Sequence, residues 1–97
     1  MAKYFRFVKE QVQKMRYQNN GRIALKIIDE SEGYRETVAI ATVNLPDEPL
    51  EPDEVFIKDW SENEGVLKDL IAMGIISKPI GSVRTEFCVA HKCKLLI

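Results

Sequence analysis

Three side chains near the C-terminus are of the types that bind metals or act as nucleophiles. Cys88, His91 and Cys93 include the single histidine and both cysteines of the chain. A structural zinc site needs four such ligands and a catalytic one needs three plus water, while a cysteine nucleophile needs a nearby histidine and an orienting group. The four ligands of a structural site are not present, and nothing nearby supplies a clear oxyanion hole, so we expect no metal, no cofactor and no enzymatic activity. A zinc protein or small enzyme that uses His91 and the cysteines is the weaker alternative.

The same two cysteines are interpreted as free thiols. If the segment between them is extended, it spans about 17 Å. A disulfide requires Cα atoms about 4.4–6.8 Å apart. A bridge would therefore require a turn between Cys88 and Cys93, and the chain shows no secretion signal that would favour oxidation.

Carboxylates are the second group that could do chemistry. Eight of the fifteen acidic residues lie between Asp47 and Glu64, where Lys58 is the only basic residue, so the segment carries a formal charge of −7. Their spacing does not match a calcium-binding EF-hand loop. A rigid array of carboxylates can instead occupy a basic groove built for phosphates. We predict that the contact surface includes Asp53, Glu54, Asp59, Trp60, Glu62 and Glu64.

A simpler interpretation is that those acidic residues cap a helix or lie exposed to solvent in a loop. Glu62 and Glu64 lie where the positive end of a helix dipole is expected. Trp60 has the amphipathic character of an interface anchor, but it would serve equally as a lid over the core at the start of that helix.

Basic residues dominate the opposite end of the chain. The first 26 residues carry a formal charge of +6, with Glu10 as the only acidic residue. Aromatic residues interleave with the basic ones, a pattern that suits single-stranded nucleic acid. The alternative nucleic-acid surface comprises Lys3, Arg6, Lys9, Lys14, Arg16 and Arg22. The pI of about 5.8 for the whole chain argues against this alternative.

The N-terminal residues are predicted to form a hairpin with strands near 9–18 and 22–29. Asn20-Gly21 favours a two-residue type I′ turn, in which both positions need positive φ. The competing prediction is a helix over residues 4–17, because apolar residues recur there at helical spacing. That helix would use Gly21 as its C-cap.

Residues 34–45 form the strongest predicted strand. Both of its faces are nearly apolar, which is typical of a central strand. Three prolines then enforce a loop over residues 45–53, and residues 54–57 are predicted to add a short strand. Residues 83–97 are interpreted as one strand, or as two short strands divided around Ala90–His91.

One helix is predicted over residues 61–73. Ser61 and Glu64 match the capping box, and Gly74 should end the helix in a left-handed conformation. The predicted fold is therefore α+β, with a mostly antiparallel sheet of four or five strands and one helix (about 61–73) packed on one face. The 97 residues are expected to make a single domain.

The setting expected from composition is the cytoplasm. No segment approaches the roughly 20 apolar residues that span a bilayer, and charges interrupt the N-terminus every two or three residues, unlike a signal peptide. We expect no membrane partner. The oligomeric state stays open.

Three stretches resemble a family of small proteins carried by phages and conjugative elements of gut bacteria. They are YQNNGRIAL at 17–25, TVNLP at 42–46 and FIKDWSENEG at 56–65. The resemblance covers roughly residues 10–97, with residues 1–9 as an N-terminal extension. The family's C-terminal turn with Gly and Pro is replaced here by Thr85-Glu86-Phe87.

The resemblance implies a mobile-element protein in a bacterial host cell, with no known activity. Small accessory proteins in that setting include inhibitors of CRISPR effectors and restriction enzymes that present negative charge to a nucleic-acid groove. The leading hypothesis is a non-enzymatic protein that binds and inhibits a host protein, such as a defence nuclease, through its acidic surface. The alternative is a nucleic-acid-binding accessory protein that uses the basic hairpin.

Overall fold

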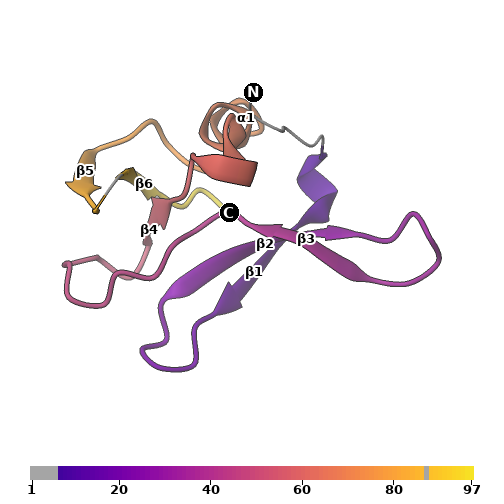
Figure 1. The fold of residues 1–97 in the computed structure, drawn as a ribbon, viewed down its shortest axis with the longest axis horizontal. Helices are drawn as coiled ribbons and strands as arrows, with labels where there is room; N and C mark the ends of the chain where they lie inside the picture. The colour runs from indigo at the N-terminus through magenta and orange to yellow at the C-terminus, as the bar shows by residue number, and fades with distance from the viewer. Residues whose placement is uncertain (1–6, 87) are drawn as a thin grey trace.

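Six strands form two antiparallel sheets in the part of the chain that the structure describes, a computed structural model covering residues 7–86 and 88–97 (Figure 1). The sheets have the strand orders β1-β2-β3 and β4-β6-β5. The strands are β1 (Val12–Arg16), β2 (Ile23–Asp29), β3 (Glu36–Ile40), β4 (Glu54–Ile57), β5 (Gly81–Arg84) and β6 (Val89–Lys94). The 3-10 helix η1 (Lys9–Gln11) precedes them, and a second, η2 (Ser61–Asn63), and the α-helix α1 (Val66–Ala72) lie between β4 and β5. The fold is α+β, but with two sheets rather than one sheet of four or five strands.

The N-terminal hairpin is confirmed, and the competing helix is wrong because Val12–Arg16 pairs with β2 as a strand. Its turn differs from the predicted type I′. Gly21 has φ of 73°, whereas Asn20 lies outside the positive-φ region. Backbone bonds from the Tyr17 N–H to the Arg22 carbonyl and from the Gly21 N–H to the Tyr17 carbonyl, both 2.8 Å, enclose a four-residue loop. The Asn20-Gly21 dipeptide therefore predicted the position of the hairpin but not the length of its loop.

The strand predicted to be central is an edge strand. β3 pairs only with β2 in its sheet, and a bulge interrupts the pairing opposite Ile27 and Ile28. Val38 and Ile40 are 42% and 40% exposed, while the small Ala39 faces the core. The apolar character of both faces predicted burial on both faces, but the neighbouring β2 occupies the centre of the sheet.

The chain passes from one sheet to the other just after β3. The Ala41 N–H donates to the Leu25 carbonyl in β2, while the Ala41 carbonyl accepts from the Lys58 N–H, both at 2.8 Å. The next residue, Thr42, forms an isolated bridge with Ile57 at the end of β4. The two sheets are thereby joined edge to edge through residues 41–43.

One hydrophobic core is shared by both sheets and α1. Its members come from β2, β4, β6 and the helix, and include Leu25, Ile57, Val66, Leu70 and Cys93. Figure 1 shows α1 lying above the two sheets. Phe7 also belongs to this core, although the resemblance assigns it to an N-terminal extension.

The helix is shorter than predicted, and the predicted capping box is wrong. Ser61 has φ of 59° and opens η2, after which Gly65, with φ of 97°, turns the chain into α1. Asp59 supplies the cap instead: its Oδ1 accepts from the Gly65 N–H at 3.0 Å and from the Leu67 N–H at 2.9 Å. The capping side chain is thus the carboxylate of Asp59, two residues before the Ser61 that the motif predicts as the cap.

The C-terminal end of the helix matches the prediction. Gly74 has φ of 75°. The Gly74 N–H donates to the Ile71 carbonyl and the Ile75 N–H to the Leu70 carbonyl, both at 3.0 Å, which is the Schellman pattern. Leu70 and Ile75 are both fully buried. β4 is also confirmed, whereas the break between β5 and β6 lies before Val89 rather than at Ala90–His91.

Within residues 7–86 and 88–97, none of the helices has the length and apolar character needed to cross a membrane.

Candidate interaction surface

The six residues of the predicted acidic surface have different structural roles. Asp53, Glu62 and Glu64 are exposed, Asp59 and Trp60 are half-buried, and Glu54 is buried. Glu54 uses its Oε1 to accept the Glu51 N–H at 2.9 Å, and Asp59 caps α1. Glu54 and Asp59 therefore hold the fold, and the carboxylates available to a partner are the exposed ones.

Three exposed carboxylates lie in one proline-containing loop, residues 45–54, which we call the acidic loop. It carries five carboxylates and no basic side chain. Asp47, Glu51 and Asp53 are exposed and Glu48 is half-buried. In Figure 1 the loop projects below β4 at the left edge of the molecule, near the turn of the β1–β2 hairpin.

Arg22 fixes the first half of the acidic loop. Its guanidinium donates from Nη1 to the Leu45 carbonyl at 2.7 Å and from Nη2 to the Glu48 carbonyl at 2.6 Å. The Glu48 N–H also donates to the Leu45 carbonyl at 3.0 Å. A planar guanidinium with two short bonds defines the distance between these carbonyls.

Backbone and ionic contacts fix the second half. The Glu54 N–H donates to the Glu51 carbonyl at 3.0 Å, and the Leu95 N–H donates to the Asp53 carbonyl at 2.7 Å. Lys94 Nζ pairs with Asp53 Oδ2 at 3.0 Å, in solvent. Prolines at 46, 49 and 52 restrict φ along the loop. The backbone of the acidic loop is therefore held in both of its halves.

Two exposed carboxylates of the acidic segment, Asp53 and Glu62, have lowered pKa values. The hydrogen bond from Lys94 lowers the pKa of Asp53, with desolvation opposing it. At the other end of the acidic segment, the hydrogen bond from Lys58 lowers the pKa of Glu62 to about 2. Both ion pairs are in contact with solvent. They therefore orient the carboxylate side chains but add little to the free energy of unfolding.

Three of the four described basic residues of the alternative surface bond within the chain. Lys14 Nζ donates to the Ile97 carbonyl at 3.2 Å, and Arg16 Nη1 donates to the Gly21 carbonyl at 2.8 Å. Arg22 holds the acidic loop. Lys9 is exposed on η1. The remaining two predicted residues, Lys3 and Arg6, lie outside the described part of the chain.

Cys88 lies in the turn just before β6, and His91 and Cys93 lie on β6 itself. Both cysteines are free thiols, as predicted, with Cys88 half-buried and Cys93 fully buried. His91, half-buried on β6, pairs in register with Ile57 and Ser82. Among the described residues, no three or more His, Cys, Asp or Glu side chains come together as a metal site.

Burial should make the two thiols differ in reactivity. Desolvation raises the pKa of Cys93 from 9.0 to about 11, so this thiol stays protonated at neutral pH. We expect iodoacetamide at pH 7.5 to alkylate Cys88 first and Cys93 only on unfolding, as tandem mass spectrometry of a peptide that contains both cysteines would show. The raised pKa also predicts that the stabilising contribution of the protonated thiol is lost between about pH 9 and 11. Equal alkylation of both thiols in the folded protein would contradict the burial of Cys93.

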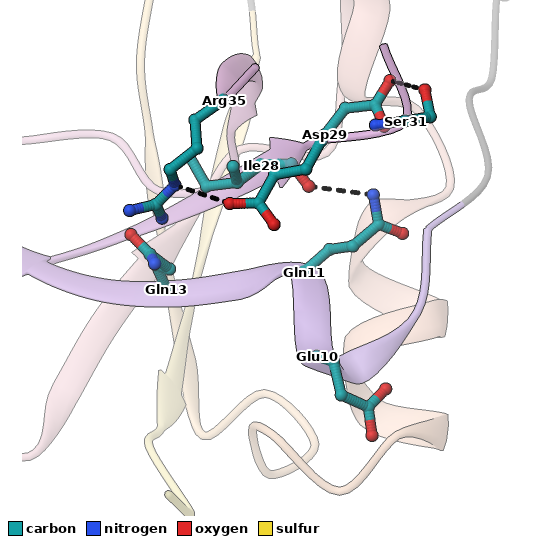
Figure 2. Close-up of a pocket in the computed structure, with 8 residues that line it drawn as sticks. Glu10, Gln11, Gln13, Ile28, Asp29, Ser31 and Arg35 are labelled. Atoms are coloured by element: carbon teal, nitrogen blue, oxygen red, sulfur yellow. Dashed lines mark hydrogen bonds and ion pairs between the residues drawn. The ribbon is translucent and has the colours of Figure 1, made fainter. Parts of the chain in front are cut away.

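A cavity of about 590 Å³ lies at the opposite end of the molecule from the acidic loop, against the turn between β2 and β3 (Figure 2). Its polar groups bond to one another: Arg35 Nε pairs with Glu30 Oε2 at 3.0 Å, and Gln11 Nε2 donates to the Ile28 carbonyl at 2.9 Å. Asp29 accepts from both the N–H and the hydroxyl of Ser31. These contacts stabilise the hairpin, and the cavity is assigned no ligand.

Sequence reasoning missed the contribution of Arg22 to the acidic loop. It grouped Arg22 with the basic residues because of its charge and position in the chain. The two groups of opposite charge are in fact neighbours in space, since the hairpin turn lies beside the loop and Arg22 spans between them. The proline-rich loop was the available signal, because it exposes carbonyl groups that need donors.

Comparison of the chain with known protein families, with curated proteins and with solved structures finds no match in any of the three.

Proposed function

We propose that this protein is a non-enzymatic accessory protein of a mobile element, which binds a basic, nucleic-acid-handling protein of a bacterial host through the acidic loop. Inhibition of a defence nuclease, of the anti-CRISPR or anti-restriction type, is the outcome that such binding would have. The observation that carries the proposal is the ordered presentation of Asp47, Glu51 and Asp53 by a loop clamped at Arg22.

Rigidity is what makes these carboxylates suited to binding. A flexible acidic segment loses conformational entropy when a partner orders it, and that loss weakens the complex. The acidic loop is already held by Arg22 at one end and by the Asp53 and Glu54 backbone contacts at the other. Complementary charge also speeds the encounter with a basic partner, most strongly at low salt.

Neutralising the acidic loop should remove binding. The test variant combines Asp47→Asn, Glu51→Gln and Asp53→Asn, which removes three exposed carboxylates and one exposed ion pair. We expect its capture of a host protein from bacterial lysate to fall at least about tenfold, since loss of a few charge-assisted contacts of about 1 kcal/mol each suffices. Capture is measured by quantitative mass spectrometry, with nuclease-treated and untreated lysate.

The chain offers a closely matched control on its other hairpin. Glu30→Gln, Glu32→Gln and Glu36→Gln together also remove three exposed carboxylates and one exposed ion pair, between Glu30 and Arg35. The control should capture the same protein as the wild type. Equal loss in both triple variants would mean that net charge alone governs capture. Capture that disappears with nuclease would favour nucleic acid and the basic hairpin instead.

A further inference from the structure

The acidic loop borders a small cavity of its own. Residues 45–48 lie beside Val83, Arg84 and Thr85, and together these segments line an open cavity of about 230 Å³. That volume is below the roughly 300–1,000 Å³ of sites for small-molecule ligands. It is of a size to take one side chain from a partner rather than a free metabolite or cofactor.

The lining of the cavity defines which side chain would fit. Leu45, Pro46 and Val83 are the apolar residues of the lining, and Asp47 and Glu48 are its acidic residues. Arg84 contributes a single positive charge, so the carboxylates outnumber the cations. A long basic side chain meets both requirements, because its methylene stem can cover apolar surface while its charged head stays at the rim.

Arginine matches the geometry better than lysine. A guanidinium can bond to one carboxylate through two parallel N–H groups or to two acceptors at once, which an ammonium group cannot do with the same fixed geometry. The same turn already binds one guanidinium, since Arg22 bonds to the Leu45 and Glu48 carbonyls.

We propose that the cavity between residues 45–48 and Val83–Thr85 is a recognition pocket for an arginine side chain of the partner protein. This inference rests on the proposed function and specifies the chemistry of the partner at that site. Recognition then depends on a filled pocket as well as on opposite charge, so a partner segment rich in lysine but lacking arginine should bind less tightly.

Val83 allows the pocket to be closed while every carboxylate is kept. Val83→Phe should fill the cavity, and Ser82→Phe is the matched control, because successive residues of a strand point to opposite faces. Ser82 is exposed and Val83 is half-buried on β5. Val83→Met gives a milder filling, for use if Val83→Phe unfolds at a lower temperature than Ser82→Phe.

The experiment is an NMR titration of the ¹⁵N-labelled full chain with the capped peptide Ac-Gly-Arg-Gly-amide. We expect saturable shifts of the amides of residues 47–48 and 83–85, about tenfold weaker binding of the uncharged citrulline peptide, and at least tenfold weaker binding to Val83→Phe or Val83→Met. Ser82→Phe should bind as the wild type does. Unchanged binding to both Val83 variants, equal binding of the citrulline peptide, or shifts confined to other residues would overturn the pocket.

The pocket and the proposed function can fail separately. If both Val83 variants still capture the host protein while the acidic-loop triple variant does not, the function stands and the pocket is rejected. If the Val83 variants lose the arginine peptide but the triple variant still captures the host protein, the pocket stands and the proposed function is rejected.

Discussion

Replacing Arg22 with alanine is expected to lower the free energy of unfolding by about 3 kcal/mol and to weaken partner capture at least tenfold. The half-buried guanidinium makes two bonds of 2.7 and 2.6 Å to carbonyls of the acidic loop. Hydrogen bonds to charged groups contribute about 1.5–3 kcal/mol each, and the freed loop can recover part of that by bonding to water. Urea unfolding gives the stability, and the lysate experiment gives the capture.

Arg22→Lys separates the geometry of the contact from its charge. Lysine keeps the positive charge but lacks the planar fork that joins the Leu45 and Glu48 carbonyls. We expect Arg22→Lys to recover less than half of the stability that Arg22→Ala loses, and little of the lost partner capture. An Arg22→Ala protein that keeps full capture would show that the order of the acidic loop does not matter for binding.

Replacing Asn63 with aspartate is expected to be the most destabilising of these substitutions, by about 3–5 kcal/mol at neutral pH. Asn63 is fully buried, and its Nδ2 donates to the Ile40 carbonyl at 2.8 Å. A carboxylate there would lose that bond and face the carbonyl oxygen as a buried charge. Such a loss is a large share of the 5–15 kcal/mol that stabilises a typical domain.

The pH dependence distinguishes a buried charge from a simple loss of packing. Burial raises the pKa of the introduced carboxyl above its value in the unfolded chain. The deficit relative to wild type should therefore be greatest at neutral pH and shrink as the pH falls and the carboxyl becomes protonated. Asn19→Asp, at an exposed position of the hairpin turn, is the control and should change stability by less than about 0.5 kcal/mol. A deficit in Asn63→Asp that does not change with pH would contradict burial of this side chain.

The sequence predicted an element correctly where the signal involved only neighbouring residues and required one backbone conformation. Gly74 ends the helix as expected because its left-handed conformation and the two Schellman bonds involve only neighbouring residues. The capping box failed for the opposite reason. Ser61 and Glu64 have the right spacing, but Asp59 and Gly65 direct the chain into a 3-10 turn before the helix begins.

The arrangement of the strands relative to one another was harder to predict from the sequence. The apolar run that includes Val38 and Ile40 has strong strand propensity, yet propensity does not tell which strands flank it. The partition into two sheets depends on the backbone switching partners at Ala41, from Leu25 to Lys58. The acidic loop was visible as a charge pattern, whereas its clamp by Arg22 and its border with Val83 depend on tertiary contacts.

The most direct test of the acidic loop as the binding surface is amide hydrogen exchange on the purified protein with and without its captured partner. Our account predicts new protection over residues 45–54 and 83–85, and unchanged exchange over the β2–β3 turn at 30–35. Protection confined to the basic hairpin at 12–22, or to the β2–β3 turn, would contradict it.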